Sequence, residues 1–241
     1  MPQNDAGDNL RTSLSRLLTS GTDTNPALNA LLADYTSYHR VLAIVGGAFL
    51  LALTTLSVML WGRFRRSRTP GRGWSFERRT YFGLGLVAFG AALFLGLVVA
   101  ANVSTVLDPR HGFGGAMGLL GTPRAGTSAA QLQDAFATWL QSGAPSVPPE
   151  VTRAIDERLA WQRPKAIITS TLLLGFVAVS AVTWRSLIRR SHGRTGRRSL
   201  RGWGLLGAGV LSVAVGLVLM LMVLGNTQGS LAPLSLTLFF G

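Results

Sequence analysis

The chain has 241 residues, of which 48% are hydrophobic and 14% charged, with a formal net charge of +13 and a mean hydropathy of +0.35. It contains no cysteine, which excludes a disulfide framework, a thiolate metal site and thiol redox chemistry. This composition suits either one large soluble domain or a small polytopic membrane protein, and the distribution of charge decides between them.

Four windows of the sequence contain no charged residue, and each exceeds the roughly 18 apolar residues that cross a hydrocarbon core of about 30 Å. A buried helix of a soluble protein is rarely apolar on all faces over such a length. The windows are 41–62, 81–107, 166–184 and 202–232. They predict an all-α polytopic membrane protein with four transmembrane helices, arranged as two tandem hairpins.

Positive charge is concentrated in two short turns, 62–80 and 185–201, which hold fourteen arginines and one acidic residue and so carry the whole net charge. Short loops rich in arginine remain in the cytoplasm. We therefore expect both turns on the cytoplasmic side of the plasma membrane, and both termini and the central segment on the outer side. In a soluble protein this charge would indicate nucleic acid, but on turns tied to a membrane at both ends we expect no nucleic-acid partner.

In chain order, the first forty residues lack a basic segment followed by an apolar one, so we predict no removable signal peptide. Leucines at i, i+4 and i+7 from Leu10 predict an outer amphipathic helix over 10–20. Pro26 favours the start of a second outer helix, 27–39. The segments that follow are the first span, 41–62, a cytoplasmic turn, 63–80, and the second span, 81–104.

The stretch 111–126 is so rich in glycine that we predict an irregular linker. A flexible lid or a phosphate-cradling loop is the alternative, but no GxxxxGK[ST] pattern follows. Beyond it the outer helices are predicted at 130–142 and 149–162. The remaining segments are the third span, 166–184, a cytoplasmic turn, 185–201, the fourth span, 203–225, and an outer tail, 226–241. The apolar end LSLTLFFG is compatible with the outer interface, with a strand added to a partner, or with a cover over the outer helices.

The two halves of the sequence align with each other at a displacement of 122 to 124 residues. The matched pairs, in order, include Leu10 with Leu132, Pro26 with Pro149, Arg40 with Arg163, Trp61 with Trp184, Gly85 with Gly209, Asn102 with Asn226 and Pro109 with Pro233. We predict a tandem duplication, with repeat 1 over 1–110 and repeat 2 over 127–241. Because each copy contains two spans, the copies should be related by an axis along the membrane normal.

Small residues recur every four positions in the second span of each copy, which lets helix backbones approach closely in lipid. We predict that they mediate helix packing, with a pore lining as the alternative: Ala88, Ala92, Gly96, Ala208, Ser212 and Gly216. The spans contain no ionisable residue. Asn102 and Asn226, at the outer helix ends, are expected to satisfy the last helical carbonyls rather than to coordinate a substrate.

The pattern of titratable residues favours neither catalysis nor metal binding. The three histidines lie on different segments: His39, His111 and His192. An outer acidic site at Asp156 and Glu157, with Asp34 at the matching place, is an alternative, but neighbouring arginines favour helix-surface ion pairs instead. We predict no catalytic residue, no cofactor-binding residue, no metal ligand and no enzymatic activity.

The arginine turns also favour contact with anionic lipid head groups, where each basic residue contributes about 1 kcal/mol near the surface. The residues predicted to make this contact are Arg65, Arg66, Arg189, Arg190, Arg197 and Arg198.

As a functional hypothesis, the sequence favours a non-enzymatic accessory or scaffold subunit of a cell-envelope membrane complex, whose partners are the lipid bilayer and other membrane or envelope subunits. The alternative is a small transporter or channel with its pathway between the two repeats. For the first hypothesis, the predicted partner surface is the apolar face of the outer helices: Leu10, Leu14, Leu17, Leu132, Phe136 and Trp139.

Overall fold

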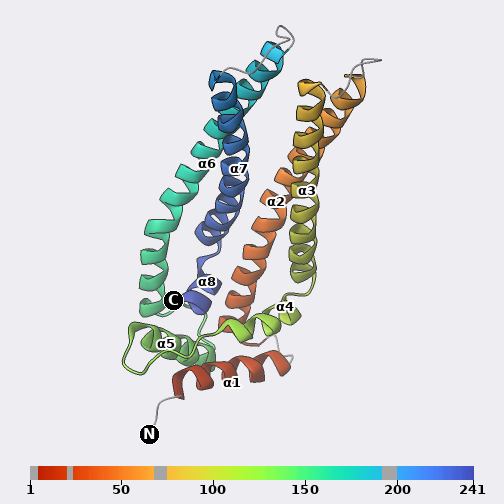
Figure 1. Cartoon of the computed structure of the whole chain (residues 1–241). Coiled ribbons are helices and arrows are strands. Elements are labelled where there is room, and N and C mark those ends of the chain that lie inside the picture. The colour runs from red at the N-terminus through yellow and green to blue at the C-terminus, as the bar shows by residue number, and fades with distance from the viewer. Residues whose placement is uncertain (1–4, 21–23, 68–74, 192–199) are drawn as a thin grey trace. The chain divides into compact units, whose positions relative to one another are not determined.

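A computed structural model describes residues 5–20, 24–67, 75–191 and 200–241, and this part of the chain is helical without any strand (Figure 1). The elements in order are α1 (Asp5–Thr19), α2 (Pro26–Arg66), α3 (Phe76–Leu107), α4 (Pro109–Ala116), the short 3-10 helix η1 (Met117–Leu119), α5 (Ser128–Ser142), α6 (Pro149–Ser191), α7 (Leu200–Leu231) and α8 (Pro233–Phe240).

Four of these helices, α2, α3, α6 and α7, are long and apolar enough to cross a membrane. This confirms the four spans predicted from the uncharged windows, and it fits an integral membrane protein. The outer helices predicted at 27–39 and 149–162 are not separate elements, because they continue without a break into the spans as the first parts of α2 and α6. No glycine or proline interrupts α2 at this junction, and α6 continues through Pro164.

The prediction of an irregular linker over 111–126 is wrong for its first part, which belongs to α4 and η1. Pro109 stands in the first turn of α4, and the Asp108 side chain accepts a hydrogen bond from the His111 N–H. A cap of this kind and a proline with a preset φ both favour helix initiation. Together they offset the conformational entropy that the glycines of this segment lose on folding.

The contacts within the chain divide it into two compact units. We call the first the core domain, made of Met1–Ala43, Ala100–Lys165 and Gly225–Gly241, and the second the span bundle, made of Ile44–Val99 and Ala166–Leu224. Each unit takes segments from both halves of the sequence.

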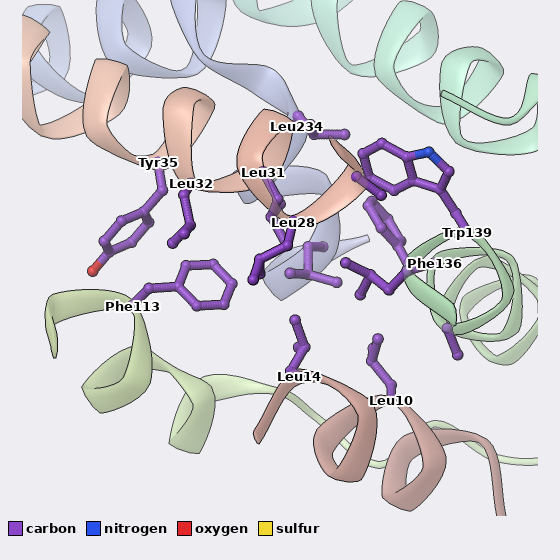
Figure 2. Close-up of a cluster of buried hydrophobic side chains, with 14 of the residues drawn as sticks. Leu10, Leu14, Leu28, Leu31, Leu32, Tyr35, Phe113, Phe136, Trp139 and Leu234 are labelled. Atoms are coloured by element: carbon purple, nitrogen blue, oxygen red, sulfur yellow. The ribbon is translucent and has the colours of Figure 1, made fainter. Parts of the chain in front are cut away.

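The core domain has a closed apolar centre in which α1 packs against α5 and both face the first part of α2 (Figure 2). Its fully buried side chains include Leu10, Leu14, Leu28, Leu31, Phe113, Phe136, Leu140 and Val151. Full burial of a leucine or phenylalanine contributes roughly 1.5–3 kcal/mol, so this cluster is the main source of stability for the unit.

In the span bundle, α2 pairs with α3 and α6 pairs with α7 (Figure 1). Leu53 packs with Ala92 and Leu95 in the first pair, and Leu173 packs with Leu219 in the second. Many large apolar side chains of these helices point outwards, among them Leu51, Leu97 and Leu174, which are 70%, 73% and 72% exposed. Apolar surface of this extent is a liability in water, whereas in a bilayer lipid tails cover it.

Candidate functional site

The span bundle contains a groove of about 490 Å³ between the α2–α3 hairpin and the α6–α7 hairpin, and we call it the inter-hairpin groove. Its walls are mainly apolar and come from all four helices, including Leu53, Leu56, Leu84, Val87, Leu173, Phe176, Val213, Leu217 and Met220. At the end nearest the arginine turns it is lined by Arg63, Tyr81, Trp184 and Arg185. The groove therefore has an apolar interior and, at the end lined by these four residues, a cationic and aromatic mouth.

Three of the six small residues predicted to mediate helix packing, Ala88, Ser212 and Gly216, line this groove. Ala92 is buried in the cluster around Leu53. The other two differ: Gly96 lies beside Leu50, while Ala208 is exposed. The small residues thus widen the space between the hairpins as well as allowing contact within one of them.

Closer packing occurs at two glycines that the four-residue spacing does not select, Gly85 and Gly209. A Cβ atom at Gly85 would lie 3.3 Å from Nε1 of Trp61, and one at Gly209 would lie 3.1 Å from Cε2 of Trp184. Each hairpin therefore packs a tryptophan ring against a bare helix backbone. The alignment of the two halves contains the signal for this contact, because it matches both the tryptophans and the glycines.

The arginines predicted to contact lipid are only partly within the described residues. Arg65, Arg66 and Arg189 are exposed, whereas the side chain of Arg190 and the whole of Arg197 and Arg198 lie outside the residues described. The arginines that line the groove, Arg63 and Arg185, were not among those predicted. They are the first arginine of each turn, two residues before Arg65 and four residues before Arg189, and so they lie closer to the apolar spans.

The predicted partner surface on the outer helices is not a free surface. Leu10, Leu14, Phe136 and Trp139 are buried in the core domain, and Leu17 and Leu132 pack against the same cluster. Figure 2 shows side chains from α1 and α5 pointing into one apolar centre. The two amphipathic faces cover each other, so the prediction that they wait for a partner is wrong.

A polar cluster in the core domain was not predicted. His39 Nδ1 lies 2.6 Å from Asn102 Oδ1, the Tyr35 hydroxyl donates to the Gly112 carbonyl at 3.1 Å, and the Gln228 side-chain amide donates to the Tyr38 carbonyl at 3.3 Å. The Asn102 side-chain oxygen is therefore paired with a histidine ring of α2. This cluster ties the ends of α3 and α7 to α2.

The two ends of α8 are held by different long helices. Near its start, both the backbone N–H and the hydroxyl of Ser235 donate to the Asp34 carboxylate of α2. At its end, Arg158 of α6 donates to the Phe240 carbonyl at 2.8 Å. The apolar tail is thus a helix covering the core domain, which excludes the strand alternative.

A second junction joins the start of α2 to the end of α5. The Asn25 side chain accepts from the Leu28 N–H and donates to the Leu140 carbonyl at 2.7 Å. Gly143 follows α5 with φ +64°, the left-handed conformation that glycine adopts most readily at helix ends. One amide side chain thereby serves two helix termini.

In the part of the chain that the structure describes, no three or more histidine, aspartate and glutamate side chains gather as a metal site would require. His39 pairs with Asn102, and the His111 backbone N–H donates to Asp108. His192 lies outside the described residues.

Comparison of the chain with protein-family models, with curated proteins and with solved structures found no match.

Proposed function

We propose that the protein is a non-enzymatic accessory or scaffold subunit of a membrane complex in the cell envelope. The observation that carries the proposal is the core domain, which has its own closed apolar centre and draws segments from both halves of the chain. A helical unit of this kind, attached to four spans, is suited to presenting a fixed surface to a neighbouring subunit.

For the orientation we propose that both arginine turns are cytoplasmic and that both termini, with the core domain, lie outside the plasma membrane. The concentration of fourteen arginines in the two turns supports this arrangement. The core domain would then face the cell exterior or the envelope space.

We also propose that the chain is a tandem duplication. Three pairs of features support it. The first pair is the Trp61–Gly85 and Trp184–Gly209 contacts, and the second is the short helices α4 and α8, which each begin with a proline. The third pair is two side chains at matching positions of α2 and α6 that donate hydrogen bonds. These donors, Tyr35 and Arg158, both bond a backbone carbonyl in the short helix of their own half.

The partner surface that we now favour is the exposed side of the first part of α6, defined by Arg153, Glu157 and Trp161. All three side chains are exposed, and Trp161 is 72% exposed. Tryptophan and arginine are enriched at protein interfaces. The corresponding part of α2, by contrast, is largely covered within the core domain.

Site-specific photocrosslinking tests this surface. A crosslinking amino acid at Arg153, Glu157 or Trp161 should capture a defined membrane or envelope protein in cells, and the same protein should co-purify in mild detergent. Thr12 and Ser15, exposed on α1, provide matched control positions that should not capture it. A protein that purifies alone and gives no product at the three α6 positions would contradict the proposal.

A second candidate function is transport, with the pathway between the hairpins, and the inter-hairpin groove is the observation that favours it. Its apolar walls suit a lipid or another amphiphile better than an ion. Flux of such solutes in reconstituted vesicles should fall with Gly216→Leu, which places a side chain in the groove, and remain with Gly207→Leu in the same helix, because Gly207 does not line the groove. No flux of any tested amphiphile would remove this candidate.

A further inference from the structure

We propose that the inter-hairpin groove binds one acyl chain of an anionic glycerophospholipid, whose phosphate lies between Arg63 and Arg185. This lipid would be a stoichiometric ligand rather than part of the shell around the bundle. The inference goes beyond the scaffold function and does not depend on it, although the choice of leaflet rests on the proposed orientation of the turns.

The chemistry of the walls selects an acyl chain. The groove is about 490 Å³ in volume, within the roughly 300–1,000 Å³ of sites that enclose small molecules. Its lining is almost wholly aliphatic and aromatic away from the mouth. The Ser212 hydroxyl, one of the few polar groups there, donates to the Gly209 carbonyl at 2.8 Å. A polar solute would lose its hydrogen bonds to water in this groove and gain none from the walls, which costs free energy. A hydrocarbon chain makes no such hydrogen bonds and does not have this cost.

The length of the groove matches one leaflet. Along α2 it extends from Leu53 to Arg63, a separation of ten residues that corresponds to about 15 Å of helix. This is half of a hydrocarbon core of about 30 Å. A lipid from the leaflet on the arginine side would therefore place its chain in the groove and its head group at the mouth.

The charge at the mouth selects an anionic head group. Arg63 and Arg185 line it from opposite hairpins, and no acidic residue is among the described residues that form the groove. The Arg63 guanidinium lies over the Tyr81 ring, 5.9 Å from its centre, which places one cation at the mouth. Guanidinium groups bind phosphate through paired N–H donors, and anionic lipids are enriched in the cytoplasmic leaflet, where we place the turns.

A transmembrane helix from a partner is the competing occupant. It would bring apolar side chains against both arginines at the mouth and leave their charges without a counter-ion. The phospholipid satisfies the apolar walls and the cationic mouth together, so we commit to it.

Native mass spectrometry of the protein in mild detergent, titrated with phosphatidylglycerol or with phosphatidylcholine of the same acyl chains, tests the proposal. The wild type should bind one phosphatidylglycerol in preference to phosphatidylcholine. An arginine near an anionic head group contributes roughly a fivefold factor in affinity, so Arg63→Gln with Arg185→Gln should weaken phosphatidylglycerol binding by about 25-fold. All four arginines are exposed, but Arg65 and Arg189 do not line the groove, so Arg65→Gln with Arg189→Gln removes the same charge and should have less than a threefold effect.

The chain contact is tested separately by Ala88→Leu with Gly216→Leu, which fills the groove. This variant should lose the bound lipid, while Gly83→Leu with Gly207→Leu, at positions of α3 and α7 that do not line the groove, should keep it. Circular dichroism and gel filtration check that each variant folds. If Ala88→Leu with Gly216→Leu does not fold, the comparison of the two arginine-to-glutamine pairs tests the proposal by itself. Equal binding of the two lipids, or equal losses in the groove and control arginine pairs, would show a non-specific lipid shell and overturn the proposal.

Discussion

The Asp34 carboxylate accepts two hydrogen bonds from Ser235, one from its backbone N–H and one from its hydroxyl, each 2.7 Å long. Helix α8 begins after Ala232, which provides no side-chain cap, whereas α4 begins after Asp108, which caps its own helix. A carboxylate from α2, 201 positions away in sequence, thus replaces the missing local cap. The contact couples the C-terminal helix to the N-terminal part of the chain.

Replacing Asp34 with alanine should release the start of α8. Loss of a helix cap and of a charge-assisted hydrogen bond should lower the free energy of unfolding of the core domain by about 1–2 kcal/mol. Hydrogen exchange of the α8 amides should become faster. Asp156→Ala removes an exposed carboxylate from α6 and serves as the control. Unchanged protection of α8 in Asp34→Ala would show that its apolar contacts alone hold it.

A substitution at Phe136 tests whether this side chain belongs to the core of the domain or to a partner surface. It is fully buried, so Phe136→Ala should lower the free energy of unfolding by about 3–5 kcal/mol through the cavity it leaves. Phe240→Ala, at a side chain that is 61% exposed, should have a small effect. Thermal unfolding in detergent measures both. If Phe136→Ala remained stable but no longer bound a partner protein, the result would support the partner surface first predicted from the sequence.

The His39–Asn102 pair can be measured by a double-mutant cycle. Because their polar atoms lie 2.6 Å apart in a half-buried setting, His39→Ala and Asn102→Ala should show a coupling free energy of about 0.5–1.5 kcal/mol. The same cycle between His39 and Asn226 provides the control, and its coupling should be close to zero. Strictly additive effects of His39→Ala and Asn102→Ala would contradict the pair.

Gly85 and Gly209 should tolerate no larger side chain. Valine at either position would push against the ring of Trp61 or Trp184, and overpacking of this kind costs about 1–3 kcal/mol. Gly83→Val and Gly207→Val are matched controls in the same helices, because nothing lies within 4 Å of an added Cβ there. The midpoint of thermal unfolding should fall more for the first pair, and equal shifts in both pairs would indicate helix propensity alone.

The proposed orientation predicts which introduced cysteines react. In intact cells, Ser67→Cys and Ser191→Cys should resist an impermeant thiol reagent because both positions lie within the arginine turns. Ser20→Cys and Ser142→Cys should react. The chain has no native cysteine, so no background labelling interferes. The reverse pattern would place the turns outside.

The sequence by itself determined the four spans and the positions of the turns, because hydropathy and charge act locally: twenty uncharged apolar residues favour a membrane-crossing helix whatever surrounds them. It also showed that Leu10 and Phe136 lie on apolar faces that need a cover. Only the tertiary structure decided that α1 and α5 cover each other, since a hydrophobic face has no preference for one apolar partner over another.

The polar contacts and the groove depend in the same way on residues that are distant in sequence. Asp34 and His39 have nothing beside them in the chain that points to Ser235 or Asn102, and only the packing of the helices brings these groups together. Arg63 and Arg65 are two residues apart in the same arginine turn, yet only Arg63 lines the groove. Successive positions on a helix are separated by about 100°, so the way the helix packs against its neighbours decides which arginine faces the groove.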